Sequence, residues 1–161
     1  MMTSDEFLQS VANETRILKH LHSKAQNLEY SPGENMRNTL ELMRYLSFCG
    51  SGPTEALIKN DWSGISTHQE RGSTMEPNEF PARLDEQEAR IRELVGALSN
   101  DDLQKEVSLP WGASMRLGSA LIDLPLKFMA SYRLQLFDHV KAAGAKDLST
   151  FNAWLGMDKP E

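Results

Sequence analysis

The chain is poor in several features that would indicate a compartment or a partner. It has one cysteine, Cys49, in 161 residues, so an internal disulfide is impossible and a reducing compartment is expected. No apolar run approaches the ~20 residues that cross a membrane. The first residues are acidic and do not resemble a secretory signal. We therefore expect a cytoplasmic protein without membrane association.

The chain also has fewer basic than acidic residues. Lysine and arginine number 17 against 23 aspartates and glutamates, which gives a formal net charge of −6. Proteins that bind nucleic acid neutralise phosphates with a basic surface. The composition therefore predicts no nucleic-acid partner.

Familiar catalytic and metal-binding motifs are missing as well. The sequence contains no G-x-S-x-G elbow, no Walker loop and no dinucleotide-binding fingerprint. His20 and His22 stand two residues apart, which on a helix separates their directions by roughly 200°. Neither H-x-x-x-H nor H-E-x-x-H occurs, so no helical histidine pair is spaced to hold a metal ion.

Helical spacing of apolar residues is what the chain does have. With 40% hydrophobic and 25% charged residues, it has the composition of a globular protein, and residues 1–161 are expected to form one domain. Thr3 and Glu6 form the T-x-x-E signature of a capping box, and Pro125 should kink or divide the last helix. Four main helices are expected, over residues 3–30, 34–48, 83–98 and 114–143. Helical turns are expected at 54–60, 101–105 and 149–155, and an extended piece at 106–111.

The long connection over residues 61–82 indicates the order of helix directions. It lacks periodicity, is rich in Gly, Ser, Thr and Pro, and is unusually long for a connection inside one domain. It is either a crossover between non-adjacent helices or a functional lid. A crossover would make the second and third helices parallel, so we predict an all-α four-helix bundle with an up-down-down-up arrangement.

Two isolated residues are candidates for chemistry. Glu14 lies on the apolar stripe of the first helix, where burial would raise its pKa and suit it to act as a ligand or base. Alternatively it lies at the edge of the stripe and reaches solvent or an arginine. Cys49 follows Tyr45 by one helical turn and would be reactive only in a positive, partly exposed setting. Otherwise it is a small buried apolar residue.

Several segments together resemble the DinB/YfiT-like superfamily. Residues 36–46 (MRNTLELMRYL) are similar to the second helix of that family. Residues 101–103 (DDL), 107–112 (VSLPWG) and 128–136 (FMASYRLQL), followed by Gly144, are similar to its C-terminal half. The resemblance covers most of the chain in order and spacing.

The resemblance implies a four-helix bundle with the up-down-down-up connection, often assembled as a homodimer. Many members hold a divalent metal, commonly nickel or zinc, with three histidines. Some transfer low-molecular-weight thiols such as bacillithiol, mycothiol or glutathione, and others have no assigned reaction.

The three histidine positions of the family fall on Tyr45, Phe128 and Tyr132 of this chain. Phenylalanine has no lone pair for a metal, and a neutral phenol is a poor ligand. We therefore expect no metal and no cofactor here. The three rings either fill the former cavity or line an amphipathic pocket for a small molecule. In the second case, Tyr45 and Tyr132 would donate hydrogen bonds and an arginine would lie near the mouth.

These observations favour a metal-free DinB-like protein that acts as a small-ligand-binding or dimeric interaction module. The alternative is an enzyme of the thiol S-transferase or hydrolase-like type with an altered active site. Its candidate groups are Glu14, His22, Tyr45, Cys49 and Tyr132. A DNA-contacting role, suggested only by the name of the family, is disfavoured by the acidic charge.

Overall fold

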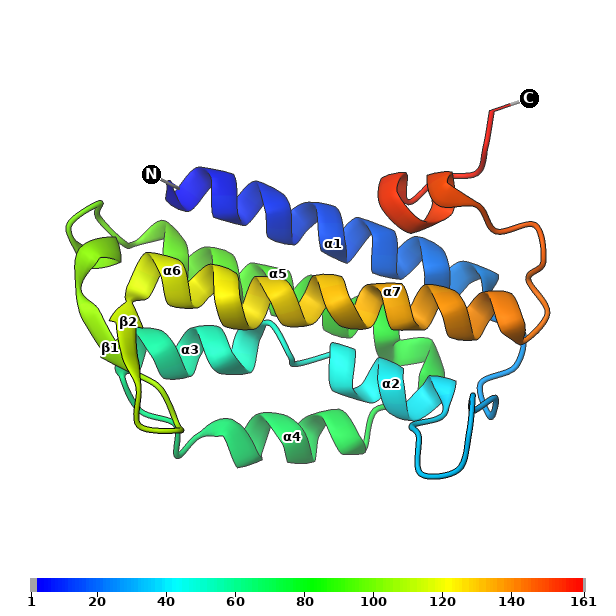
Figure 1. Ribbon diagram of the computed structural model, residues 1–161, viewed down its shortest axis with the longest axis horizontal. Helices are drawn as coiled ribbons and strands as arrows, with labels where there is room; N and C mark the ends of the chain where they lie inside the picture. The colour runs from blue at the N-terminus through cyan, green and yellow to red at the C-terminus, as the bar shows by residue number, and fades with distance from the viewer. Residues whose placement is uncertain (1–2, 161) are drawn as a thin grey trace.

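Four helical rods lie roughly side by side in the computed structural model, which describes residues 3–160 (Figure 1). The first rod is one helix, the second is broken into two helices, the third is one helix, and the fourth is continuous but irregular. The helices are α1 (Ser4–Lys24), α2 (Thr39–Leu46), α3 (Ser51–Lys59), α4 (Ile65–Ser73), α5 (Phe80–Gly96), α6 (Leu117–Leu121) and α7 (Lys127–Ala142). Shorter elements are the 3-10 turns η1 (Pro77–Glu79) and η2 (Asp102–Gln104), the π-helical segments η3 (Ile122–Leu126) and η4 (Phe151–Leu155), and the strands β1 (Glu106–Ser108) and β2 (Ser114–Arg116).

The rods follow the predicted order of directions. In Figure 1, α1 runs one way, α2 and α3 return, α5 runs parallel to α2 and α3, and α6 through α7 run back alongside α1. Helix α1 packs against α5 and α7, while the broken rod packs against α7 through α2 and against α5 through α3. The all-α four-helix bundle with an up-down-down-up arrangement is therefore confirmed, and residues 61–82 form its crossover.

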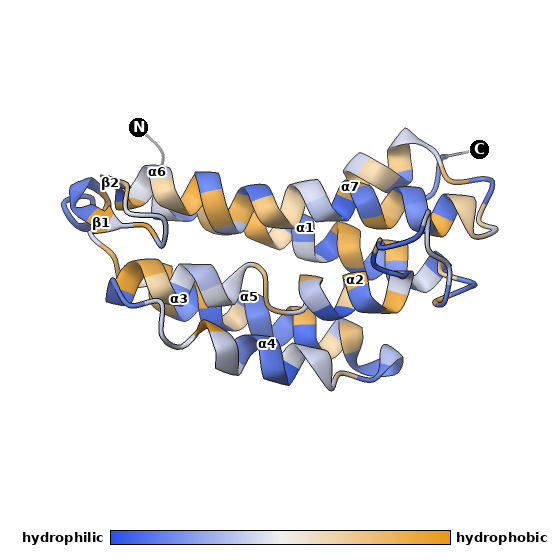
Figure 2. Ribbon diagram, turned by 60° about the horizontal axis from the view of Figure 1, so that its bottom comes forward, coloured by the Kyte–Doolittle hydropathy of each residue, from blue (hydrophilic) through white to orange (hydrophobic). Residues whose placement is uncertain are grey.

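The crossover contains a helix that the sequence analysis did not predict. Helix α4 lies outside α2 and α3 and contacts both of them. Of its nine residues, Gly72 is the one that is buried, so no apolar stripe marks the helix in the sequence. The colours in Figure 2 show that the helix is made largely of hydrophilic residues. A Cβ atom added to Gly72 would lie 2.4 Å from the Phe48 ring, so glycine permits the close approach of α4 to α2.

Capping fixes where the first two rods begin. The Thr3 side chain accepts a hydrogen bond from the Glu6 amide, and Glu6 closes the predicted capping box. The first helix was expected to reach residue 30 and the second to begin at 34. Instead α1 ends at Lys24, and α2 begins after a second capping box formed by Asn38 and Glu41. This N-x-x-E signature stops the helix from extending back to 34 because Asn38 has extended backbone geometry.

The amide of Gln87 spans the break between α2 and α3. Its Oε1 accepts hydrogen bonds from the backbone amides of Gly50 and Ser51, at 2.8 and 3.0 Å. Its Nε2 donates to the carbonyl of Leu46 at 3.0 Å. Gln87 is 3% exposed, so this side chain replaces the backbone partners that a continuous helix would supply.

The fourth rod begins later than expected. The extended piece predicted at 106–111 is strand β1, and it pairs with β2 so that Val107 lies opposite Met115. Residues 114–116 are therefore strand, and the helix starts at Leu117 rather than at 114. Pro125 does not divide the rod, because the chain passes it in one π-helical segment with helical backbone geometry on both sides.

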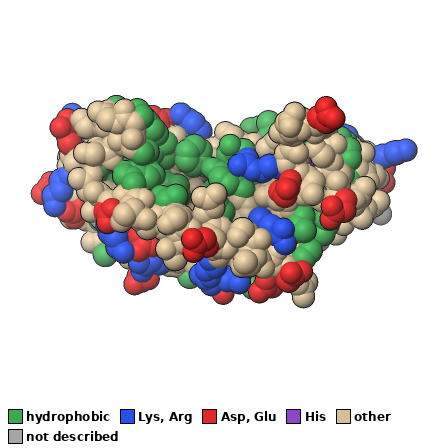
Figure 3. Space-filling view, turned by 90° about the horizontal axis from the view of Figure 1, so that it is seen from below, with side chains coloured by type: hydrophobic (Ala, Val, Ile, Leu, Met, Phe, Trp, Pro, Cys, Tyr) green, Lys and Arg blue, Asp and Glu red, His purple; other side chains and the backbone are tan. Residues whose placement is uncertain are grey.

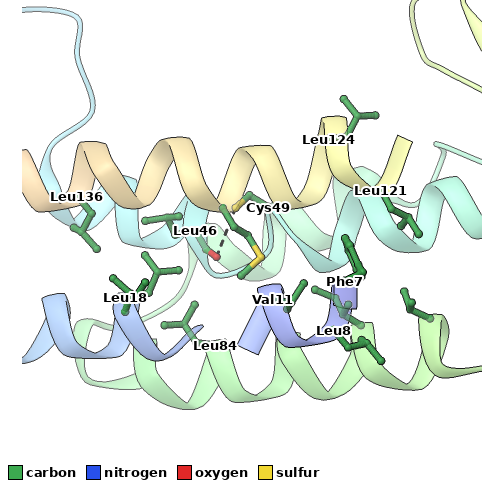
Figure 4. Packing of buried hydrophobic residues seen from close by; sticks show 14 of the residues in the cluster. Phe7, Leu8, Val11, Leu18, Leu46, Cys49, Leu84, Leu121, Leu124 and Leu136 are labelled. Carbon is green, nitrogen blue, oxygen red and sulfur yellow. Dashed lines mark hydrogen bonds between the residues drawn. The ribbon is translucent and has the colours of Figure 1, made fainter. Parts of the chain in front are cut away.

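The core runs along the axis of the bundle between the rods. Figure 4 shows Leu18 of α1, Leu84 of α5 and Leu136 of α7 packed around Leu46 and Cys49 at the break. Each of these five residues is at most 1% exposed. Within residues 3–160, no helix has the length and apolar character needed to cross a membrane.

Replacing Gln87 with leucine should lower the free energy of unfolding more than replacing an exposed glutamine does. The volume is nearly conserved, but the two amides and one carbonyl at the break lose their partner while buried. We expect the free energy of unfolding to fall by about 2–4 kcal/mol in chemical denaturation. The matched variant Gln9→Leu, at an exposed position on α1, should change it by less than about 0.5 kcal/mol. Equal effects of the two variants would contradict this account of the break.

Candidate functional site

Tyr45 and Tyr132, which the resemblance places at metal positions, contact each other in the structure. Tyr45 comes from the last turn of α2 and Tyr132 from the middle of α7. Their ring centroids are 4.7 Å apart and their planes are inclined by 64°, an edge-to-face contact. Phe48, one helical turn beyond Tyr45, adds a second edge-to-face contact with Tyr45 at 5.4 Å. Phe128 lies one turn before Tyr132 on α7 and packs partly buried against the core.

An arginine covers this aromatic cluster. The guanidinium of Arg37, at the end of the loop that precedes α2, lies 4.6 Å from the centroid of Tyr45 and 5.8 Å from that of Tyr132. Both distances are within the range of cation–π attraction. The side chain of Arg37 is exposed, and within residues 3–160 it forms no ion pair with a carboxylate. Its positive charge is therefore available at the surface of the cluster.

The environment keeps the phenol of Tyr45 protonated. Burial raises the pKa of Tyr45 most strongly, and the neighbouring Cys49 and Tyr132 raise it further. Arg37 acts in the opposite direction but does not outweigh them. Tyr45 can therefore donate a hydrogen bond at neutral pH and is not a phenolate ligand or base.

The residues at this site do not fit the metal that the fold family implies. The positions that the resemblance equates with the three histidines supply two phenols and one phenyl ring, and the cationic Arg37 lies over the two phenol rings. A divalent cation placed there would be repelled by the guanidinium and would find no imidazole. Across residues 3–160, no three His, Cys, Asp or Glu side chains are grouped so that they could hold an ion.

Cys49 lies beside the aromatic cluster but inside the core. It is 1% exposed, and its Sγ donates a long hydrogen bond of 3.9 Å to the carbonyl of Leu46 (Figure 4). Burial raises the pKa of the Cys49 thiol far more than nearby groups lower it. The thiol is thus shielded from solvent and held in its neutral form, which is the opposite of a reactive cysteine.

Glu14 and His22 are engaged elsewhere. The carboxylate of Glu14 accepts a hydrogen bond of 2.8 Å from Nε of Arg133, whose Nη1 donates to the carbonyl of Ala153. Arg133 is 3% exposed, so the pair is a buried link between α1, α7 and η4. Of the two alternatives for Glu14, the structure shows the one in which it reaches an arginine. His22 lies 3.0 Å from the carbonyl of Pro77 through Nε2 and contacts the ring of Phe80. Neither residue belongs to the aromatic cluster.

Hydrophobic side chains gather next to the charged ones on the face that Figure 3 shows. They cover the area where α3 lies beside the α6–η3–α7 rod, and this area is slightly hollowed. Partly exposed apolar residues on these elements are Ile58 of α3, Leu126 of η3 and Phe128 of α7. Phe128 is on the same helix as Tyr132, one turn earlier, which relates this apolar area to the two phenols and the guanidinium.

Sequence reasoning missed two members of the cluster. Phe48 stands three residues after Tyr45, so helical spacing could have placed it on the same face. Arg37 had no such signal, because residues 34–38 were expected to be helical and belong instead to the loop before Asn38.

Comparison with known proteins supports the fold. No protein-family model matches the chain, and no curated protein matches its sequence. Among solved structures, the chain is similar to a DinB-like protein, YjoA, from Bacillus subtilis. The TM-score is 0.70 at 13% sequence identity, over 91% of this chain and 97% of that one. The predicted resemblance is thus confirmed at the level of the fold: the chain has a DinB-like all-α architecture.

We predict that nickel, zinc and manganese do not bind stoichiometrically at Tyr45, Phe128 and Tyr132. The reason is the absence of imidazole donors together with the positive charge of Arg37. Isothermal titration of each metal into the protein should give no saturable heat. Tight binding of one equivalent that disappears in Tyr132→Phe would show that this interpretation of the site is wrong.

Proposed function

We propose that this DinB-like protein binds a small amphipathic organic anion at the aromatic cluster and needs no metal for binding. The observation that supports the proposal is the position of Arg37, which stacks on Tyr45 and Tyr132 without a carboxylate partner in residues 3–160. An exposed guanidinium above an aromatic surface suits recognition of a carboxylate or similar anion.

The neighbouring surface indicates what the rest of the ligand is like. Phe128 lies one helical turn before Tyr132 on α7, and an apolar area covers α3 and the neighbouring α6–η3–α7 rod. Burial of apolar surface contributes about 25 cal/mol per Å². A ligand with an anionic head and a short apolar body would therefore use both parts of the site, and the two phenols would donate hydrogen bonds to its polar end.

A binding function is favoured over an enzymatic one because most candidate catalytic side chains are buried or already have partners. Cys49 is buried and neutral, Glu14 is paired with Arg133, and His22 is engaged at Pro77. Of the five candidates for a thiol S-transferase or hydrolase-like reaction, Tyr45 and Tyr132 remain at the cluster, and the pKa of Tyr45 is raised. Both are suited to donating hydrogen bonds to a ligand.

Titration with octanoate and its uncharged analogue 1-octanol tests the proposal. We expect octanoate to bind with one-to-one stoichiometry and 1-octanol to bind at least about tenfold more weakly, because a charge-assisted hydrogen bond contributes about 1.5–3 kcal/mol. Arg37→Ala should remove the preference for octanoate. Tyr132→Phe should weaken octanoate about fivefold by deleting one donor.

The matched control is Arg92→Ala, since Arg92 is an exposed arginine on α5 that pairs with Glu88 and lies outside the cluster. It should bind octanoate as the unaltered protein does. The proposal fails if octanoate and 1-octanol bind equally, or if Arg92→Ala weakens octanoate as much as Arg37→Ala.

We also expect the protein to form a homodimer, as the resemblance implies. Sedimentation velocity should then give a mass twice that of the 18.1 kDa chain. If only a species of monomer mass is found, the dimer prediction is wrong. The binding proposal is not affected, because the octanoate titration tests it separately.

A further inference from the structure

A pocket lined in part by Phe48 lies between the broken rod and the crossover helix. Its walls come from the break between α2 and α3, from α4 and from α5, and its cavity volume is about 70 Å³. The residues that matter here are Ser51, His68, Arg71, Arg83, Glu86 and Arg90. It shares none of these with the aromatic cluster.

Positive charge converges on this pocket in a protein that is negatively charged overall. Three guanidinium groups line it, Arg71 from α4 and Arg83 and Arg90 from α5, together with one carboxylate, Glu86. Glu86 is shared, at 2.5 Å from Arg71 and 3.5 Å from Arg83. Since each guanidinium has five N–H donors, these contacts leave most of the donors free for a bound group.

The remaining partners of the arginines hold them in place from outside the pocket. Arg90 contacts Glu55 at 2.9 Å and Glu93 at 2.7 Å, and Arg83 contacts Glu79 at 3.4 Å. These three carboxylates do not line the pocket. The three arginines are therefore held by ion pairs to four carboxylates, of which Glu86 alone lines the pocket.

Ser51 provides an independent indication that the pocket receives a ligand. The residue is 5% exposed and forms part of the pocket wall. Its backbone amide is bound to Gln87, but its hydroxyl has no hydrogen-bond partner within residues 3–160. The buried side-chain atoms without a partner within residues 3–160 are Thr15 Oγ1 and His139 Nε2, so the Ser51 hydroxyl is not cut off from the pocket and can donate to a ligand acceptor there.

We propose that this pocket binds a phosphate group, with Arg71, Arg83 and Arg90 as cationic donors and the Ser51 hydroxyl as a neutral one. A tetrahedral phosphate accepts hydrogen bonds from several directions, which matches donors arriving from three different helices. The same chemistry serves free phosphate and the phosphate of a monoester, so both are tested.

The experiment is isothermal titration with inorganic phosphate and, separately, with phenyl phosphate, at low and constant ionic strength set with chloride. We expect saturable binding of one equivalent of at least one of the two. Tighter binding of phenyl phosphate assigns a monoester, and equal or tighter binding of inorganic phosphate assigns the free ion. Arg71→Gln should weaken binding at least about tenfold, and Ser51→Ala about fivefold, because they remove a charged and a neutral donor.

Two control variants separate this site from nonspecific attraction and from the aromatic cluster. Arg92→Gln removes an exposed arginine two positions from Arg90 and should leave phosphate binding unchanged. Arg37→Ala should also leave it unchanged, so the proposal stands or falls separately from octanoate binding. Circular dichroism melting verifies that each variant is folded. Absence of saturable binding for both ligands, or equal weakening by Arg92→Gln and Arg71→Gln, overturns the proposal.

Discussion

The break between α2 and α3 determines where the functional groups of this protein lie, and the amide of Gln87 makes that break possible. A helix that stops inside a bundle leaves buried backbone groups without partners, which is costly unless another group replaces them. Gln87 supplies three hydrogen bonds there. As a result, Tyr45 lies in the last turn of α2, Phe48 lies in the break and Ser51 begins α3.

The fold has a DinB-like architecture although its sequence has little in common with that of the similar solved structure. This is understandable because a bundle requires apolar stripes of the right period and volume and tolerates wide exchange of side chains within them. A metal centre is more demanding, since it requires particular donor atoms. The two phenols and the covering guanidinium are compatible with the packing of the bundle, but they do not supply the donor atoms of a metal centre.

Much of the architecture could be predicted from the sequence because its signals are local. The Thr3 capping box, the rod order and the long crossover all follow from spacing and loop length. The Asn38–Glu41 box carries the same signature, but Met36 and Leu40 extend the apolar spacing across it and favour a longer helix. Met36 is 48% exposed in the structure, so its place in that spacing was misleading. Helix α4 lacks an apolar stripe altogether.

The candidate sites were less predictable because their members come from distant parts of the chain. The pairing of Tyr45 with Tyr132 could be anticipated only through the family resemblance. The position of Arg37 depends on how a loop returns to the bundle, and the arginines beside Ser51 meet only because α4 folds over the broken rod. The spacing of residues within one helix does not predict either arrangement.

The π-helical segment at Pro125 also affects how the last rod is built. A π turn contains one residue more than an α turn, so the face that turns inward is shifted by one position after it. Leu117 and Leu121 are buried before the segment, and Met129, Arg133 and Leu136 after it. A helical wheel drawn through the whole rod would therefore place one half out of phase. The segment thus accommodates one extra residue: with one residue fewer over Ile122–Leu126, a regular α-helix would turn the same two faces inward, and Tyr132 would still face Tyr45.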